Sequence, residues 1–143
     1  MRVLFLILIL LSSSTAYAEW LGMIKNDDGD TYYVDFDRIR EIDGYVYYWQ
    51  LADYVKPISN EFWSAKTYHQ GDCKLFRFKH LTVYFHKEPI GGGDGKIIYP
   101  TNSDKWMYPP PNSPTEYVLK SVCDKEQHSW LKGKASEYLL KVK

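Results

Sequence analysis

Long apolar runs are almost absent from this sequence. Only residues 3–11 form an unbroken run, and nine residues are too few to span a bilayer, which takes about 20. The run follows the basic Arg2 and leads to Ala-Tyr-Ala at residues 16–18, an arrangement typical of a secretory signal peptide. We therefore expect cleavage before Glu19, which makes residues 1–18 a signal peptide and leaves an exported chain with no membrane span. No cysteine lies near the cut, so we expect no lipid anchor.

Cysteine is also scarce, with only Cys73 and Cys123 in 143 residues. No Cys-x-x-Cys pair exists, which disfavours a redox centre. No histidine or third cysteine stands at the spacing of a zinc site, which disfavours a metal site. An even cysteine count in an exported chain favours a disulfide bond between the two. Closing a loop of about 50 residues would stabilise the fold by roughly 4 kcal/mol in the chain-entropy model.

The sequence has no excess of either charge, with 18 Lys and Arg against 18 Asp and Glu. This balance gives no overall attraction for polyanions, and we expect no nucleic-acid partner. Two local excesses remain: residues 27–43 hold seven acidic and two basic residues, and residues 66–87 hold five basic and one acidic. Such surfaces are solvated, pair with each other, or form a basic face that meets an acidic partner.

No residue pattern typical of catalysis or metal binding stands out. His80 and His86 share a face of one expected strand but lie about 20 Å apart along it, too far to ligate one metal. Ser64 and Lys66 also share a strand face, and their separation of about 7 Å is too long for proton transfer. The glycine-rich residues 91–95 precede a strand-like stretch, so we expect a mobile loop and no phosphate-binding loop. We expect no catalytic residue, no metal and no cofactor.

Aromatic residues are abundant, with 13 Tyr, 6 Phe and 5 Trp. They alternate with β-branched residues in stretches typical of strands, of which the most prominent covers residues 45–54. A shorter strand at residues 31–35 precedes it, joined by a turn-like connection at residues 36–44. Neither face of the long strand is purely polar, which predicts a central strand with cover on part of each side. By the period-two rule, one face carries Tyr45, Tyr47, Trp49 and Leu51, and the other carries Val46, Tyr48, Gln50 and Ala52.

Further strands are expected at residues 19–25, 62–69 and 73–85. The first should pair with residues 31–35 through a hairpin turn that contains Asp-Gly. Pro57 should end the long strand, because proline donates no ladder hydrogen bond. Residues 70–72 are turn-like. In residues 73–85 one face changes from basic to apolar near residue 80, which predicts a bulge.

The clearest local signal is Ser113-Pro114-Thr115-Glu116, which combines a serine cap, proline at the first helical position and glutamate three residues after the cap. It predicts a helix from Pro114 to about Cys123. The following residues, 125–143, form a polar, Lys-rich tail that could hold a second, weak helix. The apolar stripe of the first helix consists of Val118, Leu119, Val122 and Cys123.

Taken in order, these features resemble the surface-adhesin protein E-like domain of bacterial exported proteins. The resemblance covers about residues 20–124 and implies an antiparallel sheet with a C-terminal helix, held by a disulfide. It also implies a surface or periplasmic module that binds host or matrix proteins without catalysis. The matching residues are Trp20, Tyr32-Tyr33-Val34-Asp35, Ile39, Gly44, Tyr47, Trp49, Leu51, Asp53-Tyr54, Ser64, Lys66, Cys73, Tyr84, Trp106, Pro111, Ser113 and Cys123.

We therefore expect an α+β domain over residues 19–124: a single antiparallel sheet of about six strands with one C-terminal helix packed on it, disulfide-linked. A helix of about 15 Å should cover the middle of one sheet face, and the bare face should expose an aromatic patch. Alternatively, the tail covers this patch through Trp130 and Leu139. The expected ligand-binding residues are Tyr45, Tyr47, Trp49, Lys74, Arg77 and Lys79.

Three functions are compatible with this domain, at a periplasmic, cell-surface or secreted location. The first is an adhesin-like module that binds a protein ligand from the host matrix or the envelope. The second is an envelope structural or accessory protein that self-associates as a homodimer. The third is a small periplasmic enzyme, which would need a pocket with converging polar groups.

Overall fold

The computed structural model describes residues 20–124. The expected signal peptide, its cleavage before Glu19 and the tail at residues 125–143 lie outside the described residues. The elements, in chain order, are β1 (Leu21–Lys25), β2 (Thr31–Val34), η1 (Phe36–Arg38), β3 (Arg40–Ile42), β4 (Tyr45–Ile58), β5 (Phe62–Asp72), β6 (Arg77–His86), η2 (Pro89–Gly91), β7 (Gly95–Ile98) and α2 (Pro114–Cys123).

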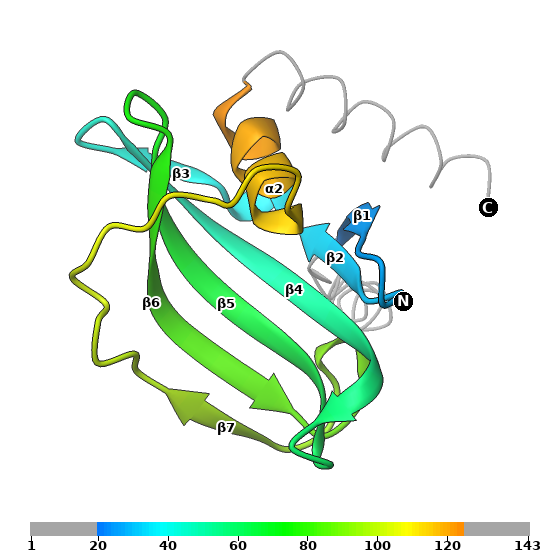
Figure 1. Cartoon of the computed structure of the whole chain (residues 1–143). Coiled ribbons are helices and arrows are strands. Elements are labelled where there is room, and N and C mark those ends of the chain that lie inside the picture. The colour runs from blue at the N-terminus through cyan, green and yellow to red at the C-terminus, as the bar shows by residue number, and fades with distance from the viewer. Residues whose placement is uncertain (1–19, 125–143) are drawn as a thin grey trace, which may run out of the picture.

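The strands form one antiparallel sheet in the order β1-β2-β4-β5-β6-β7 (Figure 1). This confirms the expected α+β class and the single sheet with a C-terminal helix. The connection at residues 36–44 is more structured than expected, because β3 within it pairs with β4 alongside β2. All three residues of β3 are exposed, so no hydrophobic alternation marked it as a strand.

Three strand boundaries differ from the expectation, and one of these is that β6 begins at Arg77 and not at residue 73. Strand β4 continues through Pro57 to Ile58, but its register with β5 shifts between Asp53 and Ile58, so the proline interrupts the ladder without ending the strand. Strand β5 runs through residues 70–72, and the turn comes after them. The Asp72 carboxylate causes this turn, since Oδ1 accepts the amides of Lys74 and Leu75 at 3.1 Å each.

The predicted bulge lies in β6. Tyr68 is opposite Thr82 and His69 is opposite His80, so Leu81 is the additional residue. Because one extra residue reverses the alternation of faces, the expected faces of residues 73–85 hold only on either side of Leu81. The bulge therefore places odd-numbered residues before Leu81 and even-numbered residues after it on the same face of the sheet.

The core lies between α2 and one face of the sheet. Val118, Leu119 and Val122 are buried against the Val46 and Tyr48 face of β4. Gly71 on β5 permits this approach, because a Cβ there would lie 2.8 Å from Val46 Cγ2 and 3.0 Å from Leu119 Cδ1. The helix contacts β1 and β4 near one end of the sheet, and not its middle as expected (Figure 1).

Both features that hold α2 were predicted. Ser113 Oγ accepts a hydrogen bond from the Glu116 amide at 3.1 Å, as expected of a serine cap. The Glu116 carboxylate accepts from the Asn112 amide at 2.6 Å and not from the amide of Ser113. The Cys73–Cys123 disulfide is present and joins the end of α2 to the turn after β5. The helix is therefore fixed at both ends.

The disulfide should contribute a large part of the stability. Replacing both Cys73 and Cys123 by serine should lower the free energy of unfolding by about 2–4 kcal/mol, because the unfolded chain regains the freedom of a 50-residue loop. Urea denaturation of the two proteins, followed by tryptophan fluorescence, measures this difference. An unchanged midpoint would show that the bridge does not stabilise the fold.

A second feature of the core is the buried His69, which is 2 % exposed. Its ring stacks on Tyr48 at 4.8 Å and meets the His80 ring edge-on at the same distance. Neither ring nitrogen has a hydrogen-bond partner in the described part of the chain. Burial lowers the pKa of His69 well below its usual value, and His80 acts in the same direction. Burial also lowers the pKa of His80.

This pair should make stability depend on pH. The unfolded chain takes up protons on both histidines near pH 6.5, whereas the folded chain resists protonation. Stability is then complete above pH 6.5 and falls as the pH drops below it, by about 1–2 kcal/mol at pH 5. Thermal unfolding at pH 7.5 and 5 measures the loss. His69→Phe keeps the aromatic stack and should reduce it; an equal loss in this variant would contradict the assignment.

Candidate functional site

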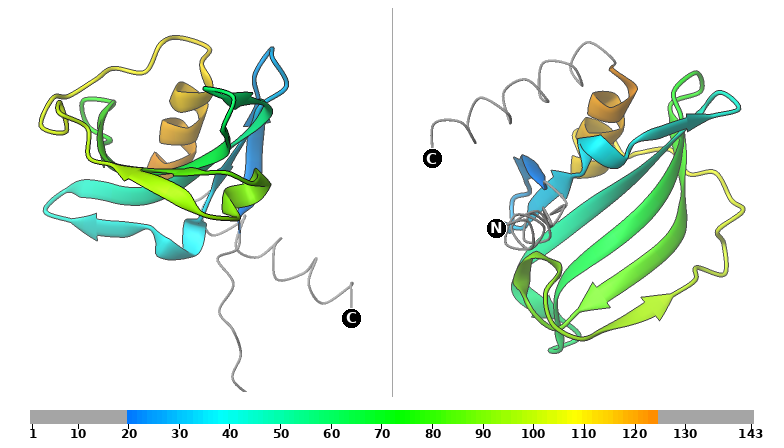
Figure 2. Two further views of the ribbon diagram at one scale, coloured as in Figure 1. Left: turned by 90° about the horizontal axis from the view of Figure 1, so that it is seen from below. Right: turned by 180° about the vertical axis from the view of Figure 1, so that it is seen from behind.

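The sheet face opposite α2 is the candidate site, and we call it the open face. No α-helix of the described chain crosses its middle (Figure 2, right). A row of aromatic rings runs over β4, β5 and β6 on this face. Trp49 stacks on Tyr68 at 4.8 Å, Tyr84 lies 6.4 Å from Trp49, and Tyr47 lies 6.2 Å from Tyr68. These rings are only partly buried, so they form an accessible aromatic surface.

One end of the row is completed by Trp106, from the segment between β7 and α2. Met107 forms an isolated bridge to Phe78, with both backbone hydrogen bonds at 2.9 Å, and thereby positions Trp106 at the edge of β6. The indole lies 5.5 Å from the Tyr45 ring and 4.5 Å from both Arg77 Cζ and Lys79 Nζ. Two cations held on an indole in this way are stabilised by the ring's negative face.

Five of the six expected ligand-binding residues are brought together on the open face: Tyr45, Tyr47, Trp49, Arg77 and Lys79. The placement of Lys74 on this face is wrong. Because the Asp72 turn takes Lys74 out of the strand, it lies beside the disulfide and lines a separate cavity of about 240 Å³ with Glu41 and Val122.

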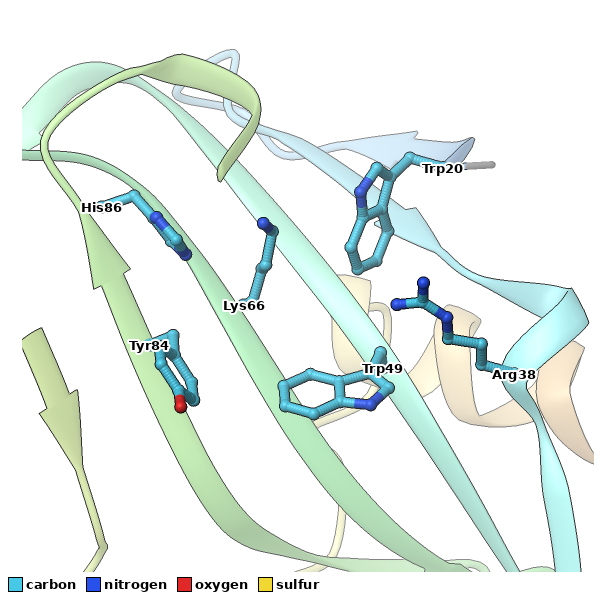
Figure 3. A pocket seen from close by; sticks show the side chains of 6 residues that line it. All are labelled: Trp20, Arg38, Trp49, Lys66, Tyr84 and His86. Carbon is cyan, nitrogen blue, oxygen red and sulfur yellow. The ribbon is translucent and has the colours of Figure 1, made fainter. Parts of the chain in front are cut away.

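A pocket of about 320 Å³ lies at the other end of the row (Figure 3). It mixes three aromatic walls with three basic side chains, and we call it the basic pocket. The sequence did not indicate it, because its members come from five separate segments. The bulge at Leu81 is the one available signal, since it places Tyr84 and His86 on the open face. The lining residues are Trp20, Arg38, Trp49, Lys66, Tyr84 and His86.

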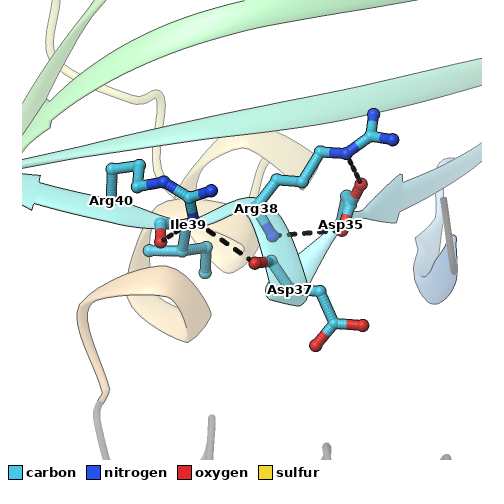
Figure 4. A network of polar contacts seen from close by, with 5 residues as sticks. All are labelled: Asp35, Asp37, Arg38, Ile39 and Arg40. Carbon is cyan, nitrogen blue, oxygen red and sulfur yellow. Dashed lines mark hydrogen bonds and ion pairs between the residues drawn. The ribbon is translucent and has the colours of Figure 1, made fainter. Parts of the chain in front are cut away.

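Arg38 lies at the end of η1 (Figure 4), and its side chain lines the basic pocket. Asp35 caps η1 by accepting the Arg38 amide at 3.2 Å, and its buried carboxylate pairs with Arg38 Nε at 3.4 Å. The Arg38 side chain nevertheless stays 52 % exposed, so its outer end remains accessible. The neighbouring Arg40 turns away and donates to the carbonyls of Asp37 and Ile39.

The turn around η2 closes one side of the pocket. Ser64 Oγ donates to the Glu88 carbonyl (2.6 Å) and accepts the Gly91 amide (2.8 Å), while Lys66 Nζ donates to the Gly91 carbonyl (2.9 Å). Asp53 Oδ1 accepts the Ile90 amide at 2.7 Å. The glycine-rich segment therefore begins in an anchored turn at Gly91, and the mobility expected for residues 91–95 stays a prediction. The Ser-x-Lys pattern serves this anchoring.

The cations of the pocket oppose one another. Burial lowers the pKa of Lys66, and the charge of Arg38 lowers it further. Burial also lowers the pKa of His86, as does the charge of Lys66, whereas the nearby carbonyls of Gly92 and Gly93 act in the opposite direction. Neither ring nitrogen of His86 forms a well-aligned hydrogen bond within residues 20–124. Such a pocket is electrostatically suited to an anion.

The residues that the structure describes form no candidate metal site. No group of three or more His, Cys, Asp or Glu side chains in residues 20–124 is placed to hold one. His80 faces α2 while His86 faces the basic pocket, because the bulge lies between them. Residues 20–124 also contain no helix that is long and apolar enough to cross a membrane.

A small antiparallel sheet with a disulfide-linked helix on one face and aromatic residues on the other defines a class of small α+β domains. The chain belongs to the family described as surface-adhesin protein E, whose model matches residues 20–124. It is thus a surface adhesin-like module of exported or surface location, as the resemblance implied. A comparison with curated proteins finds no match.

Solved structures of protein E from Haemophilus influenzae share the fold. Crystal form II has 17% sequence identity and a TM-score of 0.54, with 77% of this chain and 91% of that chain covered. The selenomethionine form has 18% identity and a TM-score of 0.53, with 77% and 89% covered. Protein E from a non-typeable strain has 16% identity and a TM-score of 0.51, with 80% and 88% covered.

The anchoring of η2 leads to a prediction. Ser64→Ala should lower the free energy of unfolding by about 0.5–1.5 kcal/mol, because it removes two part-buried hydrogen bonds to the backbone of residues 88 and 91. It should also speed amide exchange at Gly91, which NMR detects. Ser103→Ala, in the segment before Trp106, is the control and should change stability by less than about 0.5 kcal/mol. Unchanged exchange at Gly91 would contradict the anchoring role.

Proposed function

We propose that the protein is an exported, non-catalytic adhesin-like module that binds a host-matrix or envelope protein through the open face. The observation that carries this proposal is the pair of ring clusters on the open face, Trp106 with Tyr45 and Tyr47 with Tyr68, Trp49 and Tyr84, which have cations at both outer ends. Exposed aromatic surfaces of this kind usually mark contact sites. Aromatic side chains also supply most binding hot spots, together with arginine.

The charges favour an acidic partner. Lys79 carries no ion pair with an acidic side chain in the described chain, and its ammonium rests on the Trp106 ring. Arg77 pairs with Asp72 at 2.9 Å and is already partly neutralised. Arg38 and Lys66 add positive charge at the far end of the row, whereas the lowered pKa of His86 leaves that side chain mostly neutral at pH 7. Cations at the rim of an aromatic contact surface steer an acidic partner and speed association.

Self-association is the second candidate function, because the same aromatic surface could meet its copy in a homodimer. An enzymatic role receives less support. The side chains that converge on the basic pocket are cations and aromatic rings, and Ser64 and Lys66 there hold η2 in place. We propose further that the mature chain begins at Glu19 without a lipid anchor.

The proposal predicts which substitutions impair binding. With a partner selected from a panel of purified matrix and envelope proteins, Trp49→Ala should raise Kd at least about tenfold, since it removes the ring that links Tyr68 and Tyr84. Lys79→Glu should slow association, with a smaller effect at high salt. Biolayer interferometry measures both constants.

Matched controls are available away from the open face. Trp63 on β5 is 38% exposed, and Lys120 lies on α2. Trp63→Ala and Lys120→Glu should change Kd by less than about twofold, as expected for residues outside an interface. If all four variants bind alike, the open face is not the contact surface. Sedimentation that shows a dimer lost in Trp49→Ala would assign the face to self-association.

The C-terminal tail provides a further arm of this experiment. A chain that ends at Asp124 should stay soluble and keep its partner if the open face is a contact surface. Aggregation of the truncated chain would instead show that the tail covers the face.

A further inference from the structure

The basic pocket offers more hydrogen-bond donors than the protein uses. Arg38 commits Nε to Asp35, and its terminal amino groups have no partner among the described residues. They point between the rings of Trp20 and Trp49 (Figure 3). Lys66 has three donor hydrogens and spends one on the Gly91 carbonyl. No carboxylate is among the described residues that line the pocket, so nothing there neutralises these donors.

Size and walls restrict the ligand further. A volume of about 320 Å³ lies at the lower end of small-molecule pockets, which span about 300–1,000 Å³. The carboxylate of one acidic side chain would fill only part of it. A bare phosphate or sulfate would leave the aromatic walls without contact. A purely apolar ligand would cover the cations without pairing them, which is costly.

A ring that carries a carboxylate meets both requirements. The carboxylate can accept two parallel hydrogen bonds from the arginine fork. The negative faces of the indole and phenol rings attract the polarised C–H groups of a sugar ring. Trp and Tyr also present polar N–H and O–H groups, which suit the hydroxyls of a sugar.

We propose that the basic pocket binds a carboxylated sugar ring, with Arg38 and Lys66 holding the carboxylate and Trp20, Trp49 and Tyr84 stacking on the ring. This inference rests on the proposed function, because the pocket is one end of the open face. The pocket would recognise an acidic sugar either free or as a unit of a glycan on the bound surface. Because the pKa of His86 lies below its usual 6.5, this side chain adds a third cation only as the pH falls below about 6.5, and binding strengthens there.

The test is a titration of the purified protein with D-glucuronate, followed by tryptophan fluorescence and by the NMR signals of His86. D-Glucose is the comparison that lacks the carboxylate, and N-acetylglutamate is the comparison that lacks the sugar ring. We expect glucuronate to bind at least fivefold more tightly than either, and the His86 pKa to rise on binding. A hexasaccharide in which glucuronate alternates with a neutral sugar distinguishes the two sources of the ligand. Tighter binding than that of the monosaccharide indicates a glycan, and equal binding indicates a free sugar.

Two pairs of variants locate the site. Arg38→Gln should weaken glucuronate binding at least fivefold, whereas Arg40→Gln, whose side chain turns the other way, should change it less than twofold. Arg38→Gln removes the partner of the buried Asp35 and could unfold the chain, so Trp20→Ala against Trp63→Ala provides the second pair.

Three results would overturn the proposal. If glucuronate binds no better than glucose, Arg38 and Lys66 do not hold a carboxylate. N-acetylglutamate that binds as tightly as glucuronate assigns the pocket to an acidic side chain of a protein. Glucuronate affinity that survives both Arg38→Gln and Trp20→Ala places the sugar elsewhere. Lys79→Glu, at the other end of the row, separates the two proposals: it should weaken the protein partner and leave glucuronate affinity unchanged.

Discussion

The docking of α2 onto one face of the sheet is the contact on which the rest of this structure depends. Val118, Leu119 and Val122 bury their side chains against β4, and the disulfide at Cys123 prevents the helix from leaving the sheet. A ten-residue helix can cover only one face, so the aromatic residues on the other stay accessible. The same contact that forms the core therefore also creates the open face.

The second determinant is the single extra residue in β6. Leu81 reverses the alternation of faces, so Lys79 on one side of it and Tyr84 and His86 on the other all lie on the open face. Without the bulge, the two halves of β6 would point these residues to opposite faces. The aromatic row would then lack the Tyr84 end, and the basic pocket would lose one of its walls.

The stability of the site depends on polar groups that look catalytic in the sequence. Ser64 and Lys66 hold the η2 turn, and Asp35 holds both η1 and Arg38. Lys66 donates to one backbone carbonyl and Arg38 pairs with Asp35 through Nε, and the remaining donors of these two side chains are available to the pocket. Structural anchoring and ligand recognition are thus combined in Lys66 and Arg38.

The sequence alone determined what depends on local pattern: the alternating faces of β4, the capped helix Pro114–Cys123, the bulge near residue 80 and the disulfide pairing. These follow from period, capping chemistry and cysteine count, which are properties of short stretches. Only the tertiary structure decided the basic pocket, because Trp20, Arg38 and Lys66 lie far apart in the chain and meet through strand register. It also decided the exclusion of Lys74 and the anchored course of residues 88–91, since both depend on hydrogen bonds from Asp72, Asp53 and Ser64 that no local pattern reveals.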